Sequence, residues 1–237
     1  MSYRLSMRRW LVGGILGIVV VSVVAVGLYV LMNSRTYQVA GRLVDRVETD
    51  EKVVALTFDD GPTARTPEVL RILGESQVRA TFYLVGDNLA AHPEYGAAIV
   101  AAGHEIGNHS YSHRRMVLVS GGTVRDEIER TDDEIRRAGY PGPITFRPPY
   151  GKKLWTLPRY LSDHDRTTVT WDVEPDSAGG ASRAAIVADT LAETRPGSII
   201  LLHVMHGAES LASVPEIVDG LRAQGYRFVT VSELLTR

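Results

Sequence analysis

A long uncharged run near the start of the chain is the strongest hydrophobic pattern in the sequence. Residues 10–32 contain no charged side chain and are rich in Val, Ile, Leu and Gly. A helix of this length reaches about 34 Å at about 1.5 Å per residue, enough to cross a hydrocarbon core of about 30 Å. The run therefore predicts one N-terminal transmembrane helix in contact with the lipid bilayer. A cleaved signal peptide is the alternative, although its apolar region is usually about 7–15 residues long and no clear A-x-A site follows here.

Arginines before the run predict its orientation. Arg4, Arg8 and Arg9 precede it, and positively charged flanks tend to stay in the cytoplasm. We expect a single-pass protein of the cell membrane, with a cytoplasmic tip and an uncleaved signal anchor in residues 1–35 and an extracytoplasmic body. The mixed polar segment 36–50 is interpreted as a stalk.

From residue 51 onward, short apolar runs alternate with amphipathic stretches of helical length. Such alternation is typical of successive βα units in an α/β fold. One domain is expected over residues 51–237, and about seven strands with their crossovers predict a barrel. The acids of its most charged helix are interpreted as a solvated face. The expected strands are 53–58, 80–85, 104–107, 144–146, 167–171, 198–202 and 228–231, and the expected helices are 67–76, 88–102, 124–138, 183–193 and 214–223.

Charge and cysteine content exclude some partners and ligands. Of the 26 Lys and Arg residues, four lie in residues 1–35, which hold no acid, so the remaining 22 stand against 28 Asp and Glu residues. A body with this balance and no evident Lys/Arg cluster lacks the footprint of a nucleic-acid-binding protein. The chain has no cysteine, so a metal site must use histidine and carboxylate ligands. The oligomeric state is left open by the sequence.

The stretch VVALTFDDG, residues 53–61, carries the first candidate chemistry. Its six apolar or β-branched residues predict a strand, and Asp59 and Asp60 follow where that strand ends. Ligands and catalytic groups gather beyond the carboxyl ends of strands in α/β folds. Adjacent carboxylates repel unless a cation, a metal or a shared proton compensates them, and Gly61 is expected to supply the turn conformation. Two solvated acids in a simple turn are the alternative.

Two histidines follow the third expected strand. His109 and His113 are four residues apart, a spacing that puts both on one face of a helical turn and that holds zinc in HxxxH sequences. Surface or capping histidines are the alternative. Both residues are expected at the same end of the sheet as the two aspartates, and one carboxylate with two imidazoles leaves open positions for water and substrate.

Two further stretches point into the same crevice. FRPPYG, residues 146–151, places Arg147 before two prolines, where a rigid backbone presents a guanidinium that can pair with Asp59. An arginine packed on Tyr150 is the alternative. The apolar strand at 198–203 delivers His203 at its carboxyl end, where a buried structural histidine is the alternative.

These four pieces resemble the polysaccharide deacetylase family, also called the NodB-homology domain or carbohydrate esterase family 4. The motifs are TFDDG at 57–61, HSYSH at 109–113, RPPYG at 147–151 and LLH at 201–203, and the resemblance covers residues 51–235. It implies an irregular (β/α) barrel, one divalent metal that is commonly zinc and sometimes cobalt or nickel, and removal of acetyl groups from an N-acetylated sugar.

The resemblance also implies a role for each motif residue. The general base is Asp59, the arginine that orients it is Arg147, and the general acid is His203. The backbone N–H of Tyr150 helps to bind the oxyanion. The metal ligands are Asp60, His109 and His113.

The sequence departs from the family pattern around the expected acid. The acidic motif after the fifth strand reads WDVEPDS, residues 171–177, without the usual closing tryptophan. Glu174 or Asp176 is expected to support His203 in place of the usual aspartate, and the sequence does not decide between them. Val204 stands where the family often has a polar residue, which leaves the substrate open. Three aromatic residues could form a stacking floor for a sugar or belong to the core, namely Tyr150, Trp155 and Trp171.

The expected function is therefore metal-dependent N-deacetylation of a glycan. The favoured substrate is N-acetylglucosamine in peptidoglycan or in another envelope or extracellular polysaccharide. One alternative is an amidohydrolase or deformylase that acts on a lipid-linked sugar or a small amide. A catalytically silent glycan-binding module on the same barrel is the alternative from another class of function.

Overall fold

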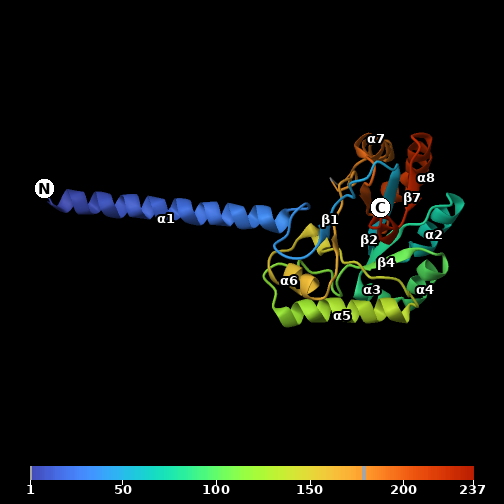
Figure 1. Ribbon diagram of the computed structural model, residues 1–237, viewed down its shortest axis with the longest axis horizontal. Coiled ribbons are helices and arrows are strands. Elements are labelled where there is room, and N and C mark those ends of the chain that lie inside the picture. The colour runs from blue at the N-terminus through green and yellow to red at the C-terminus, as the bar shows by residue number, and fades with distance from the viewer. Residues whose placement is uncertain (1, 178–179) are drawn as a thin grey trace.

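The computed structural model describes residues 2–177 and 180–237, and one long helix stands apart from the rest of the chain (Figure 1). Helix α1 (Ser2–Asn33) projects from the body. Its segment Gly13–Asn33 has a mean hydropathy of 2.8 and none of it is buried. The side chains of residues 2–12, which include Arg4, Arg8 and Arg9, lie outside the described part. An apolar helix near the N-terminus whose side chains are exposed from residue 13 to residue 30 fits a membrane span and also fits a signal sequence.

Strand β2 (Val53–Gly61) is the centre of the sheet. Its first six side chains are all buried, as expected for a parallel strand that is covered on both faces. Strand β2 pairs in parallel with three other strands, β3 (Thr81–Leu84), β6 (Ile199–Leu202) and β7 (Arg227–Val229). Strand β3 pairs in parallel with β4 (Glu105–Asn108). Five strands from different parts of the sequence are thus aligned in parallel, with their carboxyl ends at one edge.

Short bridges connect this sheet into an irregular ring. Phe146 bridges Asn108 on one side and Thr168 on the other. Strand β5 (Thr168–Val169) pairs with β1 (Leu43–Val44), and a bridge between Val173 and Ile200 returns to β6. The predicted α/β class with an irregular barrel is confirmed. The strand expected at 144–146 is reduced to these single bridges.

Helices surround the ring, and one predicted helix is divided in two at a proline. Helix α7 (Arg183–Glu193) has the expected bounds. The helix expected at 88–102 is two helices, because Pro93 has no N–H to donate and His92 has non-helical φ and ψ of −137° and 63°. Two helices, α6 (Thr156–Asp163) and α9 (Val231–Leu234), were not expected from the sequence. The remaining bounds are α2 (Thr66–Glu75), α3 (Gly86–Ala91), α4 (Pro93–Ala101), α5 (Gly121–Arg137), η1 (Pro149–Gly151) and α8 (Ala208–Ala223).

The segment interpreted as a stalk packs against the body instead. Within residues 36–50, Val44 is buried in strand β1. The backbone N–H of Val47 donates to the carbonyl of Gly197 at 3.0 Å, and the Arg46 guanidinium donates to the carbonyl of Pro196 at 2.8 Å. The stalk prediction is therefore wrong for residues 43–47, which form part of the fold.

Candidate active site

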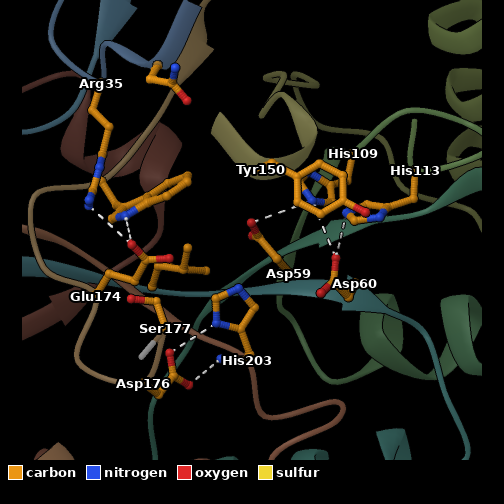
Figure 2. Close-up of a pocket in the computed structure, with 13 residues that line it drawn as sticks. Arg35, Asp59, Asp60, His109, His113, Tyr150, Glu174, Asp176, Ser177 and His203 are labelled. Carbon is orange, nitrogen blue, oxygen red and sulfur yellow. Dashed lines mark hydrogen bonds and ion pairs between the residues drawn. The ribbon is translucent and has the colours of Figure 1, made fainter. Parts of the chain in front are cut away.

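The four predicted motifs meet around one cavity at the carboxyl end of the parallel strands (Figure 2). Its volume is about 550 Å³. Strand β2 contributes the two aspartates, the segments after β4 and Phe146 contribute one wall, and the segment after β6 contributes another. The lining residues are Asn33, Arg35, Asp59, Asp60, His109, His113, Tyr150, Trp171, Glu174, Asp176, Ser177, Leu201 and His203.

A break in the register of β2 separates the two aspartates. The pairing of β2 with β3 shifts between Phe58 and Gly61, and Asp60 has a left-handed φ of 68°. Aspartate tolerates this conformation better than most residues. The expectation that Gly61 takes the turn conformation is wrong. A Cβ at Gly61 would instead lie 3.0 Å from side-chain atoms of Leu84 and Met205, so a larger residue here would require these two side chains to shift.

Arg147 lies buried beneath the cavity and pairs with Asp59. Its Nη1 donates to Asp59 Oδ1 at 2.7 Å and to the Thr57 hydroxyl at 2.8 Å, while Nη2 donates to the carbonyl of Thr170 at 2.9 Å. Arg147 is fully buried and Asp59 is 3% exposed. Buried charges are stable only when they are paired and hydrogen-bonded, and this network provides both. The guanidinium leaves Asp59 Oδ2 free, on the side of the two histidines.

The loop that carries His109 and His113 is not helical, so the expected helical turn is wrong. Ser110 and His113 have left-handed φ values of 64° and 52°. Glu127 on α5 holds the loop, because its carboxylate accepts from the backbone N–H groups of Tyr111 and Ser112 at 2.9 and 2.8 Å. The loop, rather than a helix face, brings the two imidazoles together, with ring centroids 5.0 Å apart.

Helix α5 therefore does more than present a solvated acidic face. Glu127 is 8% exposed and also accepts from the Ser112 hydroxyl at 2.7 Å. Asp132 accepts from Asn108 Nδ2 at 2.7 Å and pairs with Arg166 at 2.6 Å. The interpretation of all these acids as solvated is wrong for Glu127 and Asp132, which anchor the end of β4 and the loop after it.

Asp60, His109 and His113 form a cluster whose ligand atoms all lie within 4.8 Å of one another. Asp60 Oδ1 is 3.0 Å from His113 Nε2 and 3.5 Å from His109 Nε2. His109 Nδ1 lies 2.7 Å from the carbonyl oxygen of Arg147. A carbonyl only accepts, so Nδ1 carries a proton, and in the neutral imidazole the lone pair of Nε2 faces Asp60. This tautomer suits a metal ligand.

Asp176, and not Glu174, lies against His203. Asp176 Oδ1 accepts from His203 Nδ1 at 3.0 Å, and Oδ2 accepts from the His203 backbone N–H at 2.7 Å. Nε2 is thereby directed to the cavity (Figure 2). Glu174 instead accepts from Trp171 Nε1 at 2.9 Å and pairs with Arg35 at 3.2 Å. The alternative that the sequence left open is thus decided in favour of Asp176.

Two ionisable groups in the cavity have strongly shifted pKa values. Burial by itself would lower the pKa of His203, but the hydrogen bond to Asp176 and the charges of Asp59, Asp176 and Asp60 raise it to about 9. Burial by itself would raise the pKa of Asp60, but the hydrogen bonds and charges of His109 and His113 hold it below its ordinary value. At neutral pH His203 is therefore protonated and Asp60 is ionised.

The three aromatic candidates have different positions. Tyr150 is 54% exposed, lines the cavity and has a left-handed φ of 59°, and its ring centroid lies 4.8 Å from that of His113. Trp171 lines the cavity but is 6% exposed and packs in a buried apolar cluster, so it belongs mainly to the core. Trp155 is 65% exposed and lies outside the cavity lining. Val204 is buried beneath the site. Tyr150 is the aromatic surface available to a sugar.

Sequence reasoning missed the part of the cavity that follows α1. Asn33 and Arg35 line the cavity, although both lie in or next to the segments interpreted as anchor and stalk. No local pattern marks them, because their position depends on a contact with the body more than 110 residues away in sequence. Glu127 was missed for a similar reason, since one acid in a highly charged helix looks like its neighbours.

Comparison with known sequences places the chain among glycan deacetylases. A family model described as polysaccharide deacetylase matches residues 46–169. The chain is 37% identical over 186 residues to a peptidoglycan-N-acetylglucosamine deacetylase of Bacillus cereus (strain ATCC 14579), a match that covers 76% of this chain and 67% of that protein. Three other curated relatives are longer, and the match spans 31%, 26% and 40% of their lengths.

Solved structures with the same fold include a deacetylase and a pseudoenzyme. A peptidoglycan N-acetylglucosamine deacetylase in complex with 4-naphthalen-1-yl-N-oxidanyl-benzamide matches with a TM-score of 0.76 and 35% identity, covering 80% of this chain and 91% of that chain. A CE4 family pseudoenzyme from Bacillus anthracis matches with a TM-score of 0.75 and 27% identity, covering 81% of this chain and 68% of that chain. Whether a given chain with this fold is active therefore depends on its own side chains.

Proposed function

This chain belongs to the polysaccharide deacetylase family, and from that premise we propose that it removes N-acetyl groups from N-acetylglucosamine residues of peptidoglycan or another envelope or extracellular glycan. Membership makes it a glycan-deacetylating hydrolase. The observation that carries the proposal is the cluster of Asp60, His109 and His113 beside Asp59, with His203 lining the same cavity. The named activity of the Bacillus cereus relative and of the solved deacetylase supports the proposed sugar.

The proposed cofactor is one divalent metal ion, zinc in the first place, with cobalt or nickel as the other candidates. The ligands would be Asp60, His109 and His113. Two imidazoles and one carboxylate are a donor set that zinc accepts, and three protein ligands leave room for water and substrate. The fixed tautomer of His109, with its Nε2 lone pair directed at Asp60, fits this role. When bound, such an ion would lower the pKa of a water molecule and polarise the acetyl carbonyl.

The proposed general base is Asp59, acting through Oδ2. Its other oxygen is held by Arg147 at 2.7 Å, which fixes the position of the carboxylate and pairs it with a buried guanidinium. Oδ2 is then free to accept the proton of a water molecule that attacks the acetyl carbon. Arg147 also holds His109 through its backbone carbonyl, so a single residue positions the base and a metal ligand together.

The proposed general acid is His203. Asp176 fixes the tautomer by accepting from Nδ1, and the raised pKa of about 9 keeps Nε2 protonated at neutral pH. Nε2 can then donate its proton to the amide nitrogen as the C–N bond breaks, so that a neutral amine leaves instead of an amine anion. The acetyl group departs as acetate. The proposed oxyanion donor is the backbone N–H of Tyr150, whose left-handed φ and ring contact with His113 hold it beside the cluster.

Two alternatives remain to be separated by experiment. Hydrolysis of an amide on a lipid-linked sugar uses the same groups, and it predicts release of acetate or formate from such a substrate but none from polymeric glycan. A catalytically silent glycan-binding module predicts binding without release, and a pseudoenzyme with this fold is known. The presence of every proposed ligand, base and acid around one cavity argues against the silent module.

The proposed location is the cell membrane, with α1 as a single span, the N-terminus in the cytoplasm and the catalytic body outside. The exposed apolar segment Gly13–Asn33 supports a span. Contacts of Lys152 and Lys153 with residues 33 and 34 support a helix that remains attached to the body. The proposed partners are the bilayer and an N-acetylated glycan.

Full-length protein in detergent micelles tests this function directly. Bound metal is measured by mass spectrometry after dialysis, and acetate release is measured with N-acetylchitotetraose and with peptidoglycan. We expect about one divalent ion per chain, loss of metal in His109→Ala, and retained metal with lost acetate release in Asp59→Asn. His92→Ala, at an exposed histidine far from the cavity lining, is the matched control. Wild-type protein that holds no divalent ion, or an Asp59→Asn variant of normal activity, would contradict the assignment.

A further inference from the structure

The four residues that join α1 to the body are held in place by three separate body residues. We call residues 32–35 the junction segment. The backbone N–H of Lys153 donates to the carbonyl of Met32 at 3.2 Å, and Lys152 Nζ donates to Asn33 Oδ1 at 2.5 Å. Lys153 Nζ donates to the carbonyl of Ser34, and the Thr170 hydroxyl donates to the carbonyl of Arg35 at 2.6 Å. The junction segment is thus a docked element of the body and not a free linker.

The burial of Lys153 depends on this docking. Lys153 is 1% exposed, and burial lowers its pKa to about 8. A buried ammonium is costly unless its donors are satisfied, and the carbonyl of Ser34 is the acceptor that the structure gives it. The segment and the lysine therefore stabilise each other's position next to the cavity.

Arg35 extends from the junction segment to Glu174 (Figure 2), and both side chains line the cavity, as does Trp171. Its Nη1 is 3.2 Å from Glu174 Oε2, and its guanidinium carbon lies 5.3 Å from the ring centroid of Trp171. The same Glu174 oxygen accepts from Trp171 Nε1. The Arg35 side chain remains 47% exposed. A guanidinium has five donors in one plane, so several remain unpaired with Glu174 on a side chain that lines the cavity.

We propose that Arg35 is a substrate-binding residue, and that the junction segment forms the subsite for a sugar unit adjacent to the one that is deacetylated. This inference rests on the proposed function and extends it. The ligand chemistry is that of an uncharged glycan, because the N–H groups of Arg35 that Glu174 does not engage can donate to hydroxyl and ring oxygens. The amide of Asn33 is already engaged, since its Nδ2 donates to the carbonyl of Tyr29 at 2.6 Å and its Oδ1 accepts from Lys152 Nζ. A purely structural ion pair between Arg35 and Glu174 is the competing explanation, and exposed pairs of this kind contribute little to stability.

Steady-state kinetics of the full-length chain separate the two explanations. Acetate release from N-acetylchitotetraose is compared for wild type, Arg35→Ala and Arg42→Ala, the last being the same change seven positions later and outside the cavity lining. We expect KM to rise about 10-fold in Arg35→Ala with kcat within about twofold of wild type, since a charged hydrogen bond to substrate is lost. Arg42→Ala should match wild type. An unchanged KM in Arg35→Ala would overturn the inference and leave the proposed function intact.

A second readout measures occupancy without turnover. The chain has no cysteine, so Arg35→Cys and Arg42→Cys in an Asp59→Asn background each provide one thiol for a maleimide reagent. With N-acetylchitotetraose at about ten times its Kd, labelling at position 35 should slow about 10-fold, while labelling at position 42 should not change. Equal labelling rates at position 35 with and without glycan would overturn the inference. If wild-type protein releases no acetate, the proposed function fails, and this labelling experiment alone decides whether the segment contacts a glycan.

Discussion

Replacement of Asp176 by asparagine tests the role of His203 as general acid through the pH dependence of the activity. Asp176→Asn retains a side-chain oxygen that can accept from His203 Nδ1 and removes the negative charge. The pKa of His203 is about 9, against an ordinary value of 6.5, and the hydrogen bond to Asp176 is the largest of the contributions that raise it. Because the pKa is raised in the folded enzyme, the protonated acid is present at low pH and is lost as the pH rises through about 9.

The expected magnitude follows from the protonated fraction of His203. If the pKa returned fully to 6.5, the protonated fraction at about pH 8 would fall from about 0.9 to about 0.03, a loss of about 30-fold. At about pH 6 the same change would cost less than about twofold. Asp59 and Asp60 also raise this pKa and the ring is partly exposed to solvent, so we expect a loss of about 5- to 30-fold at about pH 8.

The assay is the pH profile of kcat/KM for acetate release by full-length protein, with metal content measured for each variant. The alkaline limb of the profile should move to lower pH in Asp176→Asn. Glu174→Gln is the matched control, because it removes a carboxylate from the same segment that contacts Trp171 and Arg35 rather than His203. The kcat/KM of Glu174→Gln can differ from that of wild type, but the pH at which kcat/KM falls on the alkaline side should be the same.

A loss of equal size at about pH 6 and about pH 8 would refute the reasoning, because it would indicate a structural role of Asp176 without an effect on the pKa of His203. The same linkage predicts a stability effect. A histidine whose pKa is raised on folding stabilises the folded state fully below pH 6.5, and this contribution disappears as the pH rises through about 9. The difference in unfolding midpoint between wild type and Asp176→Asn should therefore shrink at alkaline pH.

Other substitutions test the buried pair of Arg147 and Asp59, the loop that carries His109 and His113, and the packed segment 43–47. Arg147→Met leaves Asp59 buried without its guanidinium, so the free energy of unfolding from urea titration should fall by about 3–5 kcal/mol; an unchanged value would contradict the pairing argument. Glu127→Gln removes one of the two oxygens that accept hydrogen bonds from the loop that carries His109 and His113. Zinc affinity, measured by chelator competition, should therefore fall about 10- to 100-fold. Glu129→Gln on the same helix should leave the zinc affinity unchanged. Gly197→Ala places a Cβ 1.8 Å from the carbonyl oxygen of Val47 and should lower Tm far more than Gly103→Ala, where φ is similar and nothing lies within 4 Å. Equal shifts in Tm would mean that the segment does not pack against the body.

The order of the motifs and their convergence could be predicted from sequence because strand ends are local features. Runs such as 53–58 and 198–202 are mostly apolar, and parallel strands bring the residues that follow them to one edge. That reasoning predicted that Asp59, His109 and His203 lie together, and in the structure all three line one cavity. Their catalytic roles stay proposals.

The features that the sequence did not predict depend on contacts between segments that are far apart in the chain. Nothing local distinguishes Glu174 from Asp176, since both are acids of one turn, and the choice is made by which of them lies against β6. The non-helical loop at 109–113 is held by Glu127 from another element. Residues 43–47 are polar enough to suggest a spacer, yet they pair with β5 and with the turn before β6.

Strand β2 has a consequence for the time scale on which the site can change. Its amides and carbonyls are shared with three neighbouring strands and its side chains are buried. Backbone groups in such a position are expected to exchange with solvent deuterium only when the whole domain opens. The carboxylate pair of Asp59 and Asp60 should then keep its spacing through many catalytic cycles, so that adaptation to differently branched or cross-linked glycans has to come from the loops that face the pair.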